Sequence, residues 1–155
     1  KWNALPDKIR DEADLFTVAS SIYTPSYVSL ESAFAFYGWI PEGVFTVTSI
    51  TTLKTAFFSN KTGNFRYTNL KESLFFGFWF PGNFRMAEPE KALLDYLYLH
   101  PELVSIEDFE SLRWFREEIS GKINFQKLLD YARLFDSAVL NRRITIFKKF
   151  LDGEY

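Results

Sequence analysis

Apolar residues recur at helical spacing in the first part of the chain. Between residues 11 and 23 they fall on one face of a helix, which Thr24-Pro25 ends because the residue before proline is disfavoured in the helical region. The apolar positions are Leu15, Phe16, Val18, Ala19 and Ile22. A second, short helix follows, with Ser29 as its N-cap and Gly38 just beyond its end. Its apolar face consists of Leu30, Ala33, Phe34 and Tyr37.

The middle of the chain is dense in β-branched and aromatic residues, which predict strands. Residues 44–50 form one such run, and residues 56–59 and 64–68 flank a polar loop, which predicts a hairpin. Residues 74–80 (LFFGFWF) and 83–86 flank Pro81-Gly82, a pair typical of a type II turn with Gly82 at positive φ. Because the run 74–80 contains no Lys or Arg, we interpret it as a strand buried on both faces rather than a base-stacking platform.

The last part of the chain again has a helical pattern. Pro89 stands where the first residue of a helix is expected, between two acids that suit the positive helix end, and this helix should stop near His100-Pro101. Further helices are predicted over 106–115, 125–135 and 137–151. The pattern predicts an α+β fold, with a mostly antiparallel sheet of about four to five strands flanked by N-terminal and C-terminal helices. Because no repeat or linker interrupts it, residues 1–155 are predicted to form a single domain.

Composition narrows the class of protein. A chain of 155 residues with 47% apolar and 25% charged residues suits one soluble globular domain, and 19% aromatic residues predict a heavy core. The absence of Cys excludes disulfides, thiolate zinc sites and Cys nucleophiles, and it fits a reducing compartment. Residues 1–14 are charged and broken by Pro6, and the run 74–80 is far shorter than the ~20 residues of a membrane helix. We therefore expect a cytoplasmic protein with no membrane partner.

Catalytic groups are sparse in this sequence. His100 is the only His and lies at a predicted helix end, where we expect a surface side chain facing the negative helix terminus. The acids form two clusters, Asp11, Glu12 and Asp14 in one and Glu88, Glu90 and Asp95 in the other. Both clusters sit at predicted helix starts, where acids are stabilising without any metal. No GxSxG, Walker A or GxGxxG motif is present, so we expect no catalytic residue, metal or cofactor.

The final predicted helix offers the best binding site. Residues 101–120 hold six acids against two bases, whereas residues 121–150 hold seven bases against two acids. At 100° per residue, Leu140, Ile144, Phe147 and Leu151 share one face of the helix. The basic residues lie opposite that face or on its flanks, and they are Arg142, Arg143, Lys148 and Lys149. Such a helix presents cations to phosphates or to an acidic partner, although a solvated charged face on a packed helix has the same pattern.

Several strings, in order and at the right spacing, resemble the AbiEi family of type IV antitoxins. They are SYVSLESA at residues 26–33, YG at 37–38, IPE at 40–42, VFTVTS at 44–49, FFGF at 75–78 and MAEPEKALLDYLYL at 86–99. The resemblance runs from about residue 16 to 99 and weakly to the end. Its residues also have a folding role, since they supply caps, turns and predicted core positions. Those core positions are Tyr27, Leu30, Phe34, Phe45, Val47, Phe75, Phe76, Leu93 and Leu97.

The resemblance implies a bacterial transcriptional regulator encoded beside a nucleotidyltransferase-like toxin. The resemblance implies an N-terminal winged-helix domain that binds operator DNA. It also implies a larger C-terminal domain that carries the antitoxin activity and is a candidate for a contribution to DNA binding. This chain resembles that C-terminal domain, and we expect the winged helix to be absent from it. The implied partners are the cognate toxin and, through the missing domain, operator DNA.

Three functional hypotheses remain open at this stage. The first is a non-enzymatic antitoxin and regulator domain that acts by binding, through Arg142, Arg143, Lys148 and Lys149. The second is a nuclease-like phage-defence domain built on Glu88, Glu90 and Lys91, although the usual E-x-K spacing is missing. The third is a stand-alone DNA-binding module in which helices 125–135 and 137–151 form a helix-turn-helix.

Overall fold

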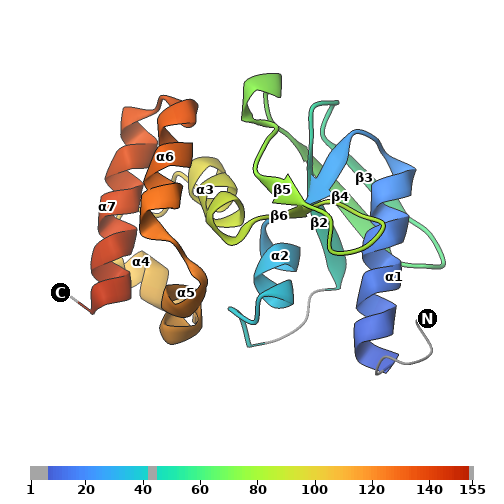
Figure 1. The fold of residues 1–155 in the computed structure, drawn as a ribbon, viewed down its shortest axis with the longest axis horizontal. Helices are drawn as coiled ribbons and strands as arrows, with labels where there is room; N and C mark the ends of the chain where they lie inside the picture. The colour runs from blue at the N-terminus through green and yellow to red at the C-terminus, as the bar shows by residue number, and fades with distance from the viewer. Residues whose placement is uncertain (1–6, 42–44, 154–155) are drawn as a thin grey trace.

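The computed structural model of the protein describes residues 7–41 and 45–153, with side chains from residue 14 onward. A single β-sheet lies beside a group of helices, and helix α1 (Asp7–Ile22) packs along the sheet on the side away from the C-terminal helices (Figure 1). The α+β class predicted from the sequence is therefore confirmed. The predicted first helix is also confirmed, since α1 ends just before Thr24-Pro25.

The sheet has six strands in the order β3-β4-β2-β1-β6-β5. In chain order they are β1 (Ser26–Val28), β2 (Thr46–Thr51), β3 (Ala56–Ser59), β4 (Asn64–Asn69), β5 (Phe78–Trp79) and β6 (Met86–Ala87). The pairs β1–β2, β3–β4 and β5–β6 are antiparallel, whereas β2–β4 and β1–β6 are parallel. The predicted count of four to five strands is therefore wrong. The additional strand is β1, whose three residues are too few to show the alternation that marks a strand.

The hairpin of β3 and β4 forms where it was predicted. Its register pairs Ser59 with Asn64 across the loop, and the Asn60 side chain accepts hydrogen bonds from the backbone N–H groups of Thr62 and Gly63. The short range of these contacts explains why the sequence pattern sufficed.

The segment 74–80 is not the doubly buried strand that the sequence predicted. It begins in a 3₁₀ turn (Glu72–Leu74), and only Phe78 and Trp79 pair with another strand. Trp79 is 42% exposed and Phe80 is 63% exposed. Phe45, another predicted core residue, is 96% exposed. Aromatic composition alone therefore did not place these side chains in the core.

The predicted reversal between residues 74–80 and 83–86 is present, because β5 and β6 pair antiparallel on either side of it. Among the described residues, the glycines with positive φ are Gly38, Gly77 and Gly153, so the expected type II turn with Gly82 at positive φ is wrong. Gly77 has a φ of 75°, and a Cβ there would lie 2.9 Å from Cγ of Lys91. Glycine thus lets the chain approach the third helix closely.

Two helices connect the sheet to the helical side of the molecule. Helix α2 (Glu31–Phe36) begins after Leu30, and Ser29 does not cap it as predicted, because the Ser29 hydroxyl is bonded elsewhere. Gly38 follows α2 with a φ of 78°, which confirms its predicted role. Helix α3 (Pro89–Leu99) begins at Pro89 and ends before His100, as predicted.

The remaining helices are α4 (Ile106–Ser111), α5 (Arg116–Lys122), α6 (Phe125–Phe135) and α7 (Ala138–Asp152). The predicted helix 106–115 is too long, because Leu112 ends α4 and Arg113 has a φ of 59°. Helix α5 was not predicted. The predicted helices 125–135 and 137–151 are confirmed, and Ser137 caps α7 by accepting a hydrogen bond from the backbone N–H of Leu140.

Aromatic rings join the two sides of the molecule. Phe34 of α2 lies 5.2 Å from Tyr96 of α3 and 5.1 Å from Trp114, measured between ring centres. The backbone N–H of Phe115 donates to the Trp39 carbonyl at 2.8 Å. Because edge-to-face rings attract beyond their buried area, this cluster holds α2 against α3 and the segment that carries Trp114. The heavy aromatic core expected from composition is therefore present.

Candidate interaction surface

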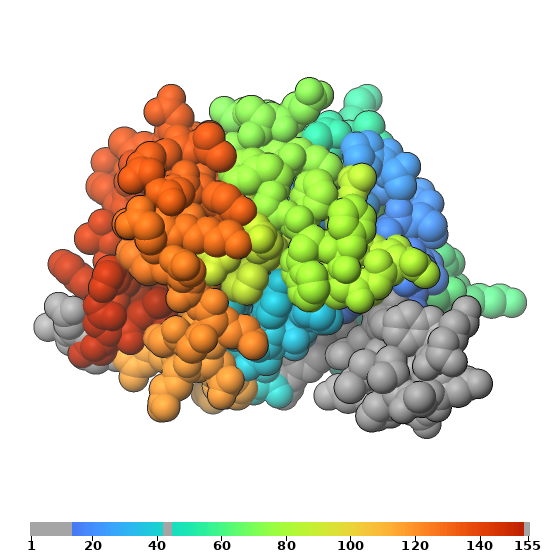
Figure 2. All heavy atoms as spheres, in the orientation of Figure 1, coloured from blue at the N-terminus to red at the C-terminus, as the bar shows by residue number. Residues whose placement is uncertain are grey.

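Helices α6 and α7 form the edge of the molecule farthest from α1 (Figure 2). Helix α7 buries the apolar face that its spacing predicted, since Leu140, Ile144 and Phe147 are all in the core. Leu151 is only half-buried, and Phe150 is buried in addition. The opposite face of α7 is therefore available to a partner.

Arg143 does not belong to the exposed basic surface that the sequence predicted. It is 9% exposed, and its Nη1 donates a hydrogen bond of 2.8 Å to the carbonyl oxygen of Leu97. Leu97 lies in the last turn of α3, where carbonyl groups have no partner within the helix. Arg143 therefore acts as a structural cap for α3, because a buried carbonyl must find a donor.

Arg142, Lys148 and Lys149 are exposed, as predicted. Lys148 pairs with Asp152 at 2.7 Å, and its Nζ lies 5.3 Å from the centre of the Phe125 ring. A groove of about 270 Å³ separates α6 from α7 beside these lysines. Its lining residues are Phe125, Leu129, Ile144, Thr145, Lys148, Lys149 and Asp152. We call this groove, together with the exposed Arg142 on the same helix, the α6–α7 surface. Apolar side chains line the groove beside Lys148, Lys149 and Asp152.

The acids of the nuclease hypothesis hold α6 against α3. Glu88 accepts hydrogen bonds from the Tyr131 hydroxyl at 2.5 Å and from Lys127 Nζ at 2.8 Å, while Glu90 accepts one from the backbone N–H of Asn124 at 2.8 Å. Burial and the hydrogen bond to Glu88 raise the pKa of Tyr131 to about 12. The hydrogen bond to Glu88 also raises the pKa of Lys127. Both carboxylates are thus engaged in joining two helices.

Lys91 points away from these acids into the core. Its Nζ donates to Asp95 Oδ1 at 2.7 Å, to the Tyr27 hydroxyl at 2.6 Å and to the Leu74 carbonyl at 2.8 Å. The side chains of Lys91 and Asp95 are both completely buried. The Nζ also lies 4.7 Å from the centre of the Phe76 ring. We call Lys91, Asp95, Tyr27 and Ser29 the buried polar network.

Asp95 completes the buried polar network from α3 to β1. Its Oδ2 accepts hydrogen bonds from the Tyr27 hydroxyl at 2.8 Å and from the Ser29 hydroxyl at 3.0 Å. Burial raises the pKa of Asp95 and lowers that of Lys91, and the attraction within the pair opposes both shifts. Sequence reasoning missed this network, although a Lys and an Asp four residues apart within an apolar helical stripe were a usable signal.

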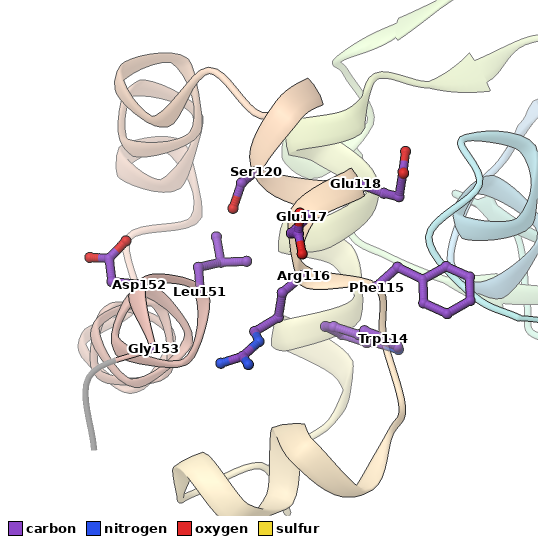
Figure 3. A pocket seen from close by; sticks show the side chains of 9 residues that line it. All are labelled: Trp114, Phe115, Arg116, Glu117, Glu118, Ser120, Leu151, Asp152 and Gly153. Atoms are coloured by element: carbon purple, nitrogen blue, oxygen red, sulfur yellow. The ribbon is translucent and has the colours of Figure 1, made fainter.

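A cavity of about 790 Å³ lies between α5 and the end of α7 (Figure 3). Arg116 extends across it toward α7 and donates to the Phe150 carbonyl at 3.2 Å. The acids do not converge there, since Glu118 points away from Asp152 in this view. This arrangement resembles a helix-end cap more than a catalytic cleft.

The other predicted sites can also be placed. The His100 ring stacks on Tyr96 with centres 3.8 Å apart, and its Nδ1 lies 2.8 Å from the Tyr96 carbonyl, which agrees with the expected place at the end of α3. Asp11 and Glu12 lie outside the residues whose side chains are described. Within the described part, no group of three His, Cys, Asp or Glu side chains could hold a metal ion.

Comparison with known proteins gives no family assignment. No protein-family model matches the chain, and neither the curated proteins nor the solved structures contain a significant match. Among the described helices, none combines the length and the apolar character needed to cross a membrane.

Proposed function

We propose that this chain is a non-enzymatic antitoxin and transcriptional-regulator domain of the AbiEi type. It counteracts a nucleotidyltransferase-like toxin in the cytoplasm by binding an acidic, amphipathic segment of that toxin on the α6–α7 surface. The observation that carries the proposal is that two exposed lysines, Lys148 and Lys149, line a groove with an apolar floor, while Arg142 is exposed on the same helix. An acidic partner segment with one apolar face complements both features. A contribution to operator binding forms part of the same proposal.

The geometry around α3 favours this proposal over a nuclease. Metal-dependent cleavage needs two acids and a Lys facing one ion. Here Lys91 donates to Asp95 in the core, while Glu88 and Glu90 face α6. The three side chains that the nuclease hypothesis requires therefore point in two directions.

The test is rescue of cells that express the nucleotidyltransferase-like toxin that this proposal assigns as the partner. We expect the double variant Arg142→Glu and Lys149→Glu to lose rescue and to bind that protein at least about tenfold more weakly, because each reversal places like charges together. The matched control is Lys61→Glu with Lys71→Glu, which changes the net charge equally at exposed sites outside the α6–α7 surface. Arg143 is left intact, since its replacement would disturb α3.

Two outcomes would contradict the proposal. Full rescue by the Arg142/Lys149 variant, or an equal loss in the control, would exclude the α6–α7 surface as the toxin contact. Tight, salt-sensitive binding of the chain to duplex DNA, lost in the same variant while rescue persists, would instead favour the DNA-binding hypothesis.

A further inference from the structure

A separate cavity lies on the sheet side of the molecule, between the end of α1, the start of β1 and the loop that joins β5 to β6. Its volume is about 440 Å³, which is within the range of small-molecule sites. The residues used below are Ser20, Ser26, Phe80 and Arg85, and we call this cavity the Arg85 pocket. Figures 1 and 2 place the β5–β6 loop beside α1, away from α6 and α7.

Arg85 is a half-buried cation held by aromatic rings. Its guanidinium carbon lies 5.0 Å from the centre of the Phe78 ring, 5.8 Å from that of Phe80 and 5.9 Å from that of Phe75. Within the described part of the chain, these ring contacts are the only partners of its guanidinium, and no acid lines the pocket. Rings satisfy the face of a guanidinium but leave its N–H donors unused. An anion in the pocket would supply the missing acceptors.

Two serines that line the same pocket have buried hydroxyls without hydrogen-bond partners. Ser26 is only 4% exposed, and neither its Oγ nor that of Ser20 has a hydrogen bond in the described structure. A buried hydroxyl without a partner costs free energy, so such groups are uncommon unless a ligand or water meets them.

We propose that the Arg85 pocket binds a mononucleotide. The Arg85 guanidinium holds its phosphate, and the exposed ring of Phe80 stacks on its base. The planar donor fork of Arg fits a phosphate better than a spherical anion, and base–aromatic stacking is favourable for every base. This inference does not rest on the proposed function, because it concerns another face of the molecule.

Calorimetric titration of the chain with AMP, adenosine, inorganic phosphate and a single-stranded oligo(dA) tests the proposal. We expect AMP to bind with a dissociation constant below about 1 mM, and adenosine and phosphate to bind at least about tenfold more weakly. Arg85→Gln should weaken AMP binding at least about tenfold, since it removes a charged hydrogen-bond donor. Phe80→Leu should weaken AMP binding and leave phosphate binding unchanged.

The matched control is Arg66→Gln. Arg66 also lies over a phenylalanine ring, at 5.4 Å from the centre of Phe57, but it does not line the Arg85 pocket. This variant should bind AMP as the unaltered chain does. Arg85→Lys keeps the positive charge and the aliphatic part of the side chain but removes the planar guanidinium. It therefore tests whether the guanidinium N–H donors are needed for AMP binding, even if Arg85→Gln fails to fold.

The proposal is overturned if AMP binds no better than adenosine, or if all the Arg85 variants bind AMP as tightly as Arg66→Gln does. It is also overturned if the oligonucleotide binds and AMP does not, because the occupant would then be a strand rather than a single nucleotide.

Discussion

Replacement of Asp95 by Asn should destabilise the protein strongly. Asp95 is completely buried and accepts hydrogen bonds from Lys91, Tyr27 and Ser29. Asn has nearly the same shape, so the change creates little cavity. It removes the negative charge, however, and leaves the ammonium group of Lys91 in the core without a counterion. The variant therefore isolates the electrostatic contribution of the pair.

The expected magnitude follows from burial. Breaking a buried ion pair by removing one partner costs roughly 3–5 kcal/mol, because the remaining charge stays desolvated. A domain of this size has a total stability of roughly 5–15 kcal/mol, so the loss is a large fraction of it. Lys91→Met should be similarly destabilising, since it leaves the Asp95 carboxylate in the core without a counterion. The double variant should lose less than the sum of the two single losses, by at least about 1 kcal/mol, because no uncompensated charge remains.

Urea unfolding at neutral pH, followed by tryptophan fluorescence and circular dichroism, measures these differences. Lys148 and Asp152 are the control pair, with the same spacing of four residues and the same N–O distance of 2.7 Å, but on the surface. Asp152→Asn should cost less than about 1 kcal/mol, because exposed ion pairs contribute little. A loss of under about 1 kcal/mol for Asp95→Asn, or strictly additive single losses, would refute the reasoning.

Two further predictions follow from the helix ends. Arg143→Met should lower the free energy of unfolding by about 1–3 kcal/mol, because the Leu97 carbonyl loses its hydrogen-bond donor. Arg142→Met, the control at an exposed position, should change it by less than about 0.5 kcal/mol. Urea unfolding of both variants measures the difference, and equal effects would contradict the burial of Arg143. Asp108 accepts hydrogen bonds from the backbone N–H groups of Val104 and Ser105, which lower its pKa from the usual 3.8. The contribution of the Asp108 carboxylate to stability is therefore present above pH 3.8 and is lost as the pH falls through the lowered pKa. The melting temperature of Asp108→Asn should therefore fall less steeply in acid than that of the unaltered chain. The same acid dependence in both proteins would contradict this.

The sequence predicted best where the deciding interactions are local. The starts of α3, α6 and α7 follow from Pro89, Asn124 and Ser137, which act on groups within one turn of themselves. The β3–β4 hairpin follows from its loop for the same reason. Predictions for 74–80 failed because the approach of Gly77 to Lys91 comes from another element of the fold.

The candidate site divides in the same way. Helical spacing was sufficient to place Arg142, Lys148 and Lys149 on the outer face of α7. It could not show that Arg143, one residue further along, caps the end of α3. Helical spacing also could not predict the Arg85 pocket, because the pocket is formed by β1 and the β5–β6 loop, which are far apart in the sequence.

The sequence by itself determined the class of fold, the positions of most helices and the basic character of α7, because periodicity, caps and charge act over a few residues. Only the tertiary structure decided which polar groups are buried together. The buried polar network and the Arg85 pocket each arise from segments that meet only on folding, so the same lysine or arginine is a core residue or a binding residue according to what packs against it.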